Sequence, residues 1–278
     1  MIQTVKKRVS LTENISFTSG LIKSLDLQTV CTEAMCPNIY DCYSRKKVTF
    51  IILGNICTRN CMFCAVKHGN PDKKIDTDEP NRIAYAVLKL GLKHAVITSV
   101  TRDDLVDGGA EQFVSVVKKI RMLTDNVKLE LLVPDFGGDT DAVKSIVDVH
   151  PDIIAHNIET VPRLYPKVRA GASYIRSLEL LKKVKDYVTR NSSNLIKTKS
   201  GLMVGLGETI TEIKETMSDL KKVGCEIFTI GQYLQPTKKQ LPVRKYYTEK
   251  EFELLYHIAK DIGFNEVYSG YFIRSSYV

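Results

Sequence analysis

Six of the seven cysteines in this sequence fall within its first 64 residues, where they form two triplets. The triplets are Cys31, Cys36 and Cys42, spaced Cx4Cx5C, and Cys57, Cys61 and Cys64, spaced Cx3Cx2C. Thiolates gathered in this way are the usual ligands of zinc ions and iron–sulfur clusters. A structural site of either kind normally closes with four protein ligands, whereas each triplet supplies three. The sequence therefore predicts two metal centres that each leave a coordination position for a substrate, a cofactor or an unusual ligand.

Other uses of cysteine fit the spacing less well. Disulfides are disfavoured by the odd number of cysteines and by an N-terminus that does not resemble a secretory segment. Zinc stays open as an alternative, because Cys61 and Cys64 form a CxxC pair. Zinc sites usually combine two such pairs, however, and no second CxxC or HxxxH pair follows in the sequence. Cys225 begins C-E-I-F-T-I, a predicted buried strand, and is expected to be a core thiol.

Length and composition indicate one globular domain with a basic surface. The chain has 278 residues, of which 44% are hydrophobic, enough for a sizeable core. A net charge of +8 and a pI near 9.0 favour acidic partners. Lysine and arginine are scattered in short runs, which indicates a solvated surface, and we expect no nucleic-acid partner.

Membrane and targeting signals are weak. No apolar stretch approaches the roughly 20 residues of a membrane span. The N-terminus, M-I-Q-T-V-K-K-R, is positively charged but has no apolar core like that of a signal peptide. We therefore expect a cytoplasmic protein and leave organelle import open.

Short apolar runs alternate with amphipathic segments from residue 48 onward, which predicts an α/β fold. The predicted strands are 48–54, 94–100, 127–133, 151–157, 196–205 and 225–230. The predicted helices that follow them are about 79–90, 109–123, 139–149, 173–188, 209–223 and 248–262. Strands joined by helices are parallel, and right-handed crossovers curve their sheet. Six units are fewer than the eight of a closed barrel, so we predict a partial (β/α)6 TIM-like barrel.

Three parts follow from this alternation. Residues 1–47 are an N-terminal extension with the first cysteine triplet, 48–263 are the partial barrel, and 264–278 are a short C-terminal tail. The second triplet directly follows the first predicted strand of the barrel. Because barrel enzymes place their sites at the C-terminal ends of their strands, we expect the chemistry at that end.

The segment C-T-R-N-C-M-F-C (57–64) resembles the CxxxCxxC signature of radical S-adenosylmethionine (SAM) enzymes. Taken as a whole, the chain resembles the lipoyl synthase family. The segments that carry this resemblance are 29–42, 52–64, 96–110, 134–138, 155–165, 199–208, 229–236 and the terminal R-S-S-Y at 274–277. The combination of Cx4Cx5C with R-S-S-Y is specific to that family, whereas CxxxCxxC alone indicates a radical SAM enzyme of unspecified activity.

The resemblance implies two [4Fe–4S] clusters and SAM as cofactors. The cluster on Cys57, Cys61 and Cys64 would bind SAM at its open iron and cleave it reductively. The cluster on the first triplet would be an auxiliary cluster that is consumed as the sulfur source. Its fourth ligand in this family is a serine of R-S-S-Y, which we assign to Ser276, with Ser275 as the alternative.

The implied reaction is a sulfurtransferase reaction. Two sulfur atoms enter at C6 and C8 of an octanoyl chain bound by an amide to a lysine of a lipoyl carrier domain. Unactivated C–H bonds have no acidity that a side-chain base can use, so a cofactor-derived radical carries the hard step. The implied partners are the E2 subunits of 2-oxoacid dehydrogenases, the glycine cleavage H protein, an electron donor such as ferredoxin or flavodoxin, and a cluster-assembly carrier.

Individual SAM contacts are harder to assign. Gly205 and Gly207 in M-V-G-L-G-E allow close approach of a ligand to the backbone and are expected to contact SAM, with a simple turn as the alternative. Arg102 is expected to bind polar groups of SAM, with a structural role at the start of the next helix as the alternative. Departures from the usual family pattern, such as Thr32 for glutamate and Tyr43 for tryptophan, remove no cluster ligand.

Overall fold

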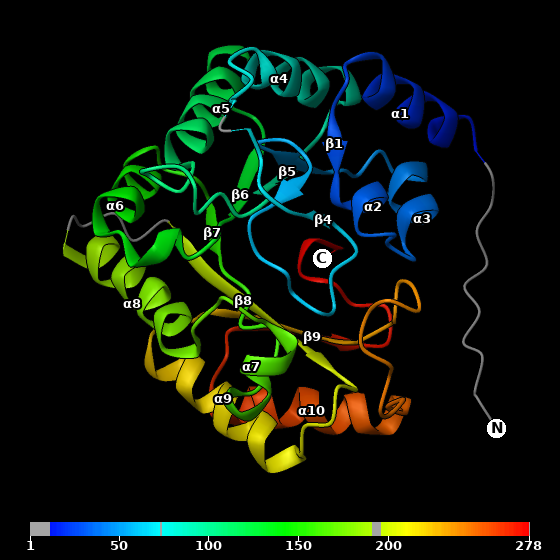
Figure 1. Cartoon of the computed structure of the whole chain (residues 1–278), viewed down its shortest axis with the longest axis vertical. Helices are drawn as coiled ribbons and strands as arrows, with labels where there is room; N and C mark the ends of the chain where they lie inside the picture. Colours follow the sequence, from blue (N-terminus) through cyan, green and yellow to red (C-terminus); the bar gives the residue numbers. More distant parts are fainter. Residues whose placement is uncertain (1–11, 73, 191–195, 278) are drawn as a thin grey trace.

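The computed structural model describes residues 12–72, 74–190 and 196–277. Its centre is a curved eight-stranded sheet with the order β1-β2-β5-β6-β7-β8-β9-β10 (Figure 1). All neighbours pair in parallel except β1 and β2, which are antiparallel. The strands of this sheet are β1 (Gln28–Thr29), β2 (Thr49–Ile52), β5 (His94–Ser99), β6 (Lys128–Leu132), β7 (Ile153–Ala155), β8 (Lys197–Val204), β9 (Ile227–Gln232) and β10 (Glu266–Gly270).

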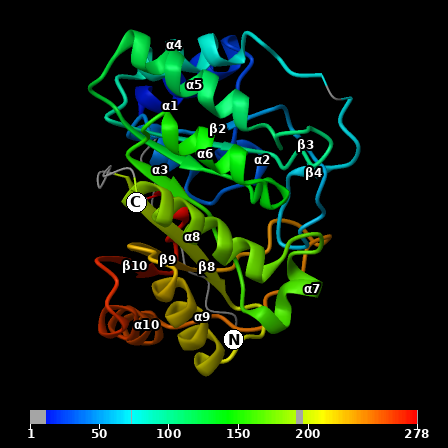
Figure 2. The same cartoon turned by 90° about the vertical axis from the view of Figure 1, so that its left-hand side faces the viewer.

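Helices cover the outer face of this sheet, as the two views show (Figures 1 and 2). Those that follow the six predicted strands are α4 (Glu79–Leu90), α5 (Ala110–Leu123), α6 (Thr140–Asp148), α8 (Tyr174–Arg190), α9 (Ile210–Lys222) and α10 (Glu249–Ile262). All six predicted strands and all six helices are confirmed. The sheet is open between β1 and β10, so the predicted partial TIM-like barrel is confirmed as well.

Both flanking parts of the chain add to the sheet. The N-terminal extension contributes β1 and three helices, α1 (Glu13–Ser24), α2 (Val30–Glu33) and α3 (Ile39–Ser44). The segment expected to be a short tail begins with β10, which pairs with β9 along its whole length. The division at residues 47 and 263 stays a prediction. The structure adds that one sheet runs through all three parts.

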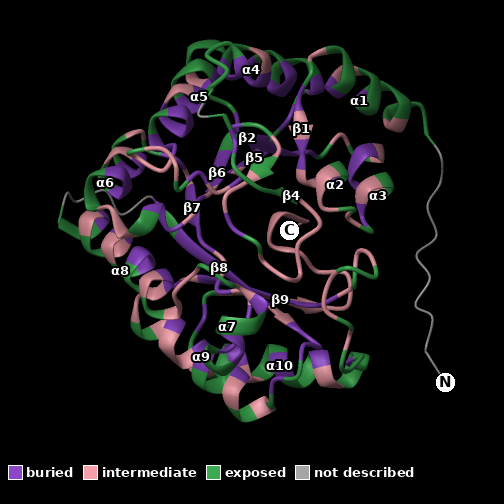
Figure 3. Cartoon of the chain, viewed as in Figure 1, coloured by how far each residue is buried: buried purple, intermediate pink, exposed green. Residues whose placement is uncertain are grey.

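Local sequence signals explain where the helices begin and end. Pro80 lies in the first turn of α4, and Gly91 ends that helix with a left-handed φ of 65°. The helices α9 and α10 each begin with a capping box, formed by Thr209 with Glu212 and by a second Thr–Glu pair at residues 248 and 251. The buried residues lie on the strands and on the inward faces of the helices, as the pattern of apolar residues in the sequence predicts (Figure 3). Among the described residues, no helix has the length and apolar character needed to cross a membrane.

The sheet carries a buried ion pair at its centre. Lys199 on β8 donates from Nζ to both carboxylate oxygens of Glu130 on β6, at 3.0 and 3.1 Å. The two side chains are 2% and 0% exposed, and His94 Nε2 lies 3.2 Å from the same carboxylate. Burying two charges is costly, and removing one partner leaves the other uncompensated in a low-dielectric interior.

We predict that Lys199→Met lowers the free energy of unfolding by about 3–5 kcal/mol, because Glu130 then keeps its buried charge without its partner. Urea unfolding followed by circular dichroism measures this. Lys197 on the same strand is a matched control, because it also pairs with a glutamate (Glu266) but is 49% exposed. Lys197→Met should cost less than about 1 kcal/mol. Equal losses in the two variants would contradict the importance assigned to the buried pair.

Candidate functional site

A cavity of about 490 Å³ opens at the C-terminal ends of the strands. Cys57, Cys61 and Cys64 reach it from the loop after β2, and Cys36 reaches it from the N-terminal extension. The C-terminal segment contributes Ile273, Arg274, Ser275 and Ser276 to its lining. Residues far apart in the sequence, including members of both triplets, therefore share one cavity of a size typical for small-molecule sites.

The second triplet is held by the loop after β2 and by the small β3 (Ile56–Cys57) and β4 (Lys67–His68) ladder. Burial raises the pKa of Cys61 to about 11, and it raises that of Cys64 to about 12. The neighbouring sulfur of Cys57 adds to both shifts, so the three thiols lie close enough to interact. The backbone N–H of Thr101 donates to Cys57 Sγ at 3.3 Å. Buried thiols become thiolates when a metal supplies compensating positive charge, and N–H···S bonds of this kind are typical around iron–sulfur clusters.

The first triplet is gathered in the same way. Cys31 and Cys42 are buried, while Cys36 is half-buried and lines the cavity. Burial, with a smaller contribution from charge on Cys42 and Cys36, raises the pKa of Cys31 to about 12. The C-terminal segment passes near this triplet, because Arg274 interacts electrostatically with Cys36. In the same segment, Ser275 Oγ is buried in the cavity wall without a hydrogen-bond partner. An orphaned buried hydroxyl in a cavity that thiols also line fits a metal ligand, since a buried polar atom is otherwise hydrogen-bonded.

The described residues contain no preformed site for a single metal ion. In residues 12–72, 74–190 and 196–277, no three His, Cys, Asp or Glu side chains converge closely enough to hold a single ion. A zinc ion would require its thiolates within about 4 Å of one another, given Zn–S bonds of about 2.3 Å. Both triplets nonetheless interact electrostatically within themselves.

A polar wall faces the second triplet. Asn157, Glu159 and Arg169 all line the cavity. Arg169 lies close enough to Cys61 to offset part of the rise in pKa that burial causes there. Burial raises the pKa of Glu159, and Arg169 offsets this only in part. Asn157 Oδ1 is buried without a hydrogen-bond partner, so it has an unused acceptor at the cavity. An amide, a carboxylate and a guanidinium together can bind a ligand that carries hydroxyl, ammonium and carboxylate groups.

The residues of this polar wall were not assigned to the SAM site from the sequence. The segment H-N-I-E-T lies at the end of β7, where the barrel rule placed functional residues, but nothing in it showed which side chains face inward. Arg169 was missed entirely, because it follows the short helix α7 (Tyr165–Val168), which has no periodic signal. His156 also lines the cavity, but its ring nitrogens are occupied by the Val133 carbonyl and Ser177 Oγ, and burial lowers its pKa to about 3.

Arg102 lies away from this cavity. Its guanidinium makes two 2.8 Å hydrogen bonds to Asp104 and one of 3.2 Å to the carbonyl of Leu53. It is 1% exposed and does not line the cavity, whereas its neighbour Thr101 does. The structure thus gives Arg102 the structural role that was its alternative, and its contact with SAM stays a prediction that the geometry does not support.

Gly205 and Gly207 also lie outside the cavity lining. Both have left-handed backbones, with φ of 108° and 113°, and the Gly205 N–H is bound by Glu208 at 2.6 Å. The glycines that do line the cavity are Gly201 on β8 and Gly231 on β9. A Cβ at 231 would lie 2.1 Å from the Ile273 carbonyl, so glycine there lets the C-terminal segment cross β9. Gly205 and Gly207 as SAM contacts stay predictions without support from this geometry.

Comparison with known proteins agrees with this arrangement. A model of the Radical SAM superfamily matches residues 51–220. The lipoyl synthase of Caldicellulosiruptor saccharolyticus is 50% identical over 100% of this chain and 97% of its own length. The lipoyl synthase of Caldanaerobacter subterraneus subsp. tengcongensis is 49% identical over 96% of this chain and 92% of its own length.

Solved structures share the fold at low sequence identity. HydG, a maturase of the [FeFe]-hydrogenase, aligns with a TM-score of 0.61 and 15% identity, over 78% of this chain and 50% of its own. Methylornithine synthase (PylB) aligns with a TM-score of 0.56 and 14% identity, over 90% of this chain and 81% of its own. These two structures support the fold, and the near full-length relatives support the family. The chain belongs to the lipoyl synthase family, within the radical SAM superfamily.

Proposed function

We propose that this protein inserts two sulfur atoms at C6 and C8 of an octanoyl chain carried on a lysine of a lipoyl carrier domain. The observation that supports this best is the shared cavity, which brings Cys36 of one triplet, the whole second triplet and the C-terminal serines together. A sulfur source and a radical source must both reach the same carbon chain, and one cavity allows this. The name of the curated relatives, lipoyl synthase, agrees with this reaction.

The second triplet is proposed to hold the [4Fe–4S] cluster that binds SAM. When bound and reduced, such a cluster supplies the electron that cleaves SAM and so provides the radical chemistry that unactivated C–H bonds require. Thr101 N–H orients the sulfur of Cys57. Cys61 and Cys64 are half-buried in the cavity wall, where desolvation raises their pKa.

The polar wall is proposed to bind SAM next to that cluster. Arg169 is suited to the carboxylate of the methionine part, because its guanidinium is buried close to Cys61. Glu159 and the unused acceptor of Asn157 are suited to hydroxyl or ammonium donors. These residues replace Gly205, Gly207 and Arg102 in the proposed SAM site.

The first triplet is proposed to hold the auxiliary [4Fe–4S] cluster, which is the sulfur-donating substrate of the reaction. Ser275 and Ser276 both line the cavity, and both belong to a short helical turn at Ser275–Tyr277. The unpartnered hydroxyl favours Ser275 as the fourth ligand. Ser275 was the alternative to Ser276 in the assignment from the sequence. Oxygen is a poorer match for iron than thiolate in such clusters, so the serine-bound iron is the easier one to release.

The rest of the cavity suits an aliphatic chain and a protein substrate. Apolar side chains that include Met35, Phe63 and Leu234 line it. The open edge of the partial barrel leaves room for a carrier domain, and the net charge of +8 favours acidic partners. The E2 and H-protein carriers, a ferredoxin or flavodoxin donor, a cluster-assembly carrier and a cytoplasmic location remain part of this proposal.

Cys31→Ala tests the sulfur-donor assignment. The variant should still cleave SAM but form no thiolated product, because it loses the donor cluster and keeps the SAM-binding one. The measurement is anaerobic incubation with an octanoyl-lysine peptide, SAM and dithionite, followed by mass spectrometry of peptide and nucleoside. Wild-type protein should contain about eight iron atoms per chain, as two [4Fe–4S] clusters require. Normal lipoyl formation by Cys31→Ala would refute the assignment.

Ser275→Ala and Ser276→Ala separate the two candidate ligands. If Ser275 is the ligand, only its replacement should change the Mössbauer signal of the one iron atom with an oxygen ligand and lower product yield by at least about tenfold, a typical effect for altered metal ligation. Ser276→Ala is the matched control, because it removes the same atom from the same turn. The reverse pattern would restore the assignment to Ser276.

Asn157→Ala and Glu159→Gln should weaken SAM binding by at least about tenfold each, the loss expected for one hydrogen bond to a charged or strongly polar group. Equilibrium dialysis with labelled SAM measures the dissociation constant directly. Asn126→Ala, at an exposed loop position, is the control and should leave it unchanged. Unchanged affinity in both test variants would remove the polar wall from the SAM site.

A further inference from the structure

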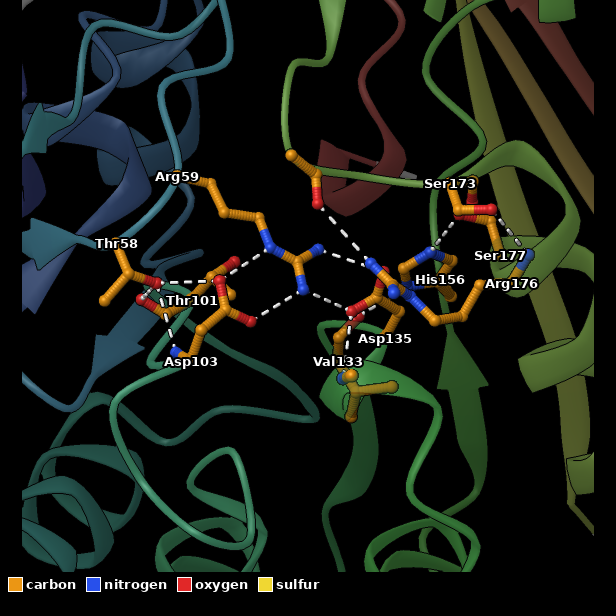
Figure 4. Close-up of polar contacts among 12 residues, drawn as sticks. Thr58, Arg59, Thr101, Asp103, Val133, Asp135, His156, Ser173, Arg176 and Ser177 are labelled. Carbon is orange, nitrogen blue, oxygen red and sulfur yellow. Dashed lines mark hydrogen bonds and ion pairs between the residues drawn. The ribbon is translucent and has the colours of Figure 1, made fainter.

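The arginine inside the second cysteine loop lies at the centre of a charge-balanced group (Figure 4). Arg59 donates from Nε and Nη2 to Asp103 at 2.9 and 2.7 Å, and from Nη1 and Nη2 to Asp135 at 2.9 and 2.6 Å. Arg176 Nε donates to the same Asp135 at 2.8 Å. Arg59 is 7% exposed and Asp135 is 0% exposed. Two arginines thus neutralise two carboxylates beside the cysteines, and we call these four residues the arginine clamp.

Within the arginine clamp, Arg59 joins three parts of the barrel rim. Asp103 follows β5 and Asp135 follows β6, whereas Arg59 belongs to the loop after β2. A guanidinium that makes a bidentate pair with each of two carboxylates fixes orientation as well as distance. Lysine carries the same charge but cannot reproduce this geometry. Arg59 is therefore equipped to hold the cysteine loop in one position relative to the ends of two strands.

The contacts continue from the clamp to the sulfur of Cys57. Thr58 Oγ1 donates to Asp103 Oδ2 at 3.0 Å, and the Thr58 N–H donates to the Thr101 carbonyl at 2.9 Å. The N–H of Thr101 in turn donates to Cys57 Sγ at 3.3 Å. The segment 101–103 is thus held at one end by Arg59 and holds the cysteine sulfur at the other.

We propose that Arg59 is a positioning residue that sets the reduction potential of the cluster bound by Cys57, Cys61 and Cys64. It keeps segment 101–103 in place, so that the Thr101 N–H stays on the sulfur of Cys57. Hydrogen bonds to cluster ligands stabilise the extra negative charge of the reduced state and so raise the potential. The inference rests on the proposed function only in requiring an iron–sulfur cluster on this loop.

A purely structural arginine would behave differently from a positioning one. Loss of packing or of an ion pair would lower stability and cluster content together, without moving the potential of the clusters that remain. A simple charge effect would appear on removing the cation but not on replacing it by lysine. Variants that change geometry without changing charge therefore decide the question.

The experiment compares Arg59→Lys, Arg59→Gln and Thr58→Val in the full-length, anaerobically reconstituted protein. Redox titration followed by electron paramagnetic resonance gives the midpoint potential, using the signal that changes when SAM is added. Arg59→Lys should shift the one-electron equilibrium at least about tenfold toward the oxidised cluster, which corresponds to about 59 mV in the negative direction. Arg59→Gln should shift it at least as far, because Asp103 also loses its counter-charge. Thr58→Val changes no charge and should shift it in the same direction.

Arg176→Lys is the matched control. It keeps a positive charge beside the same Asp135 and leaves the contacts between Arg59 and segment 101–103, so its midpoint potential should equal that of the wild type. Wild-type potentials in both Arg59→Lys and Thr58→Val would overturn the proposal, as would a shift confined to Arg59→Gln. If Arg59→Lys holds no cluster, Thr58→Val decides alone.

The outcome can be distinguished from failure of the proposed function. A wild-type protein that forms no lipoyl product but shows the expected potentials would refute the sulfur insertion and support the role of Arg59. If the wild-type protein makes the lipoyl product while the variants keep the wild-type potential, the sulfur insertion is supported and the role of Arg59 is refuted. A wild-type loop without any cluster would contradict both.

Discussion

The desolvation of thiols is the constraint on which this structure depends. Burial raises the pKa of Cys31, Cys61 and Cys64 well above the ordinary value of a cysteine. A buried thiol is an inert group unless positive charge reaches it, and metal coordination is the strongest source of such charge. The same burial that makes the free thiols unreactive also keeps water from a reactive cluster once it is bound. Holding these thiols in desolvated positions is therefore costly without metal and useful with it.

The architecture meets this constraint by joining the segment around Cys36 and Cys42 to the C-terminal segment. The Asn38 side chain donates to the Phe272 carbonyl at 2.8 Å, and Tyr277 Oη donates to Asp41 at 2.8 Å. These contacts tie the helix that carries Cys42 to the segment that carries the serines. Close passage of that segment over β9 requires a residue without a side chain, which Gly231 supplies. Closure of the site depends on these contacts between distant segments as much as on the barrel.

Periodicity and ligand spacing were the parts of the structure that the sequence could reveal. Six strands and six helices were predicted correctly, because buried parallel strands and amphipathic helices have strong local patterns. The strand β10 was taken for a tail, since E-V-Y-S-G has no long apolar run and its residues are only half-buried. The two-residue strand β1 is too short to leave a pattern.

The orientation of single side chains could not be predicted in the same way. Gly205 and Gly207 do need left-handed backbones, but a glycine-rich turn at a strand end does not show which way its backbone faces. Arg102 lies beyond the end of β5, next to the cavity residue Thr101, and outside a strand no regular alternation shows which way a side chain points. The unpartnered hydroxyl of Ser275 is a property of packing that no local pattern encodes.

Glu159 is placed in this cavity by an unfavourable backbone conformation. Its φ of 65° is unfavourable for a residue with a side chain, at a cost on the order of 1–3 kcal/mol. Two backbone hydrogen bonds to β8 hold it there: its N–H donates to the Gly201 carbonyl at 2.9 Å, and its carbonyl accepts from the Met203 N–H at 2.9 Å. The carboxylate then lies near Arg169, which faces Cys61, and near Arg274, which faces Cys36. Arg169 and Arg274 thus interact with the same carboxylate, and each lies near a different triplet. Because Coulomb interactions are strong in a desolvated site, a change of charge at one triplet affects the arginine at the other through Glu159.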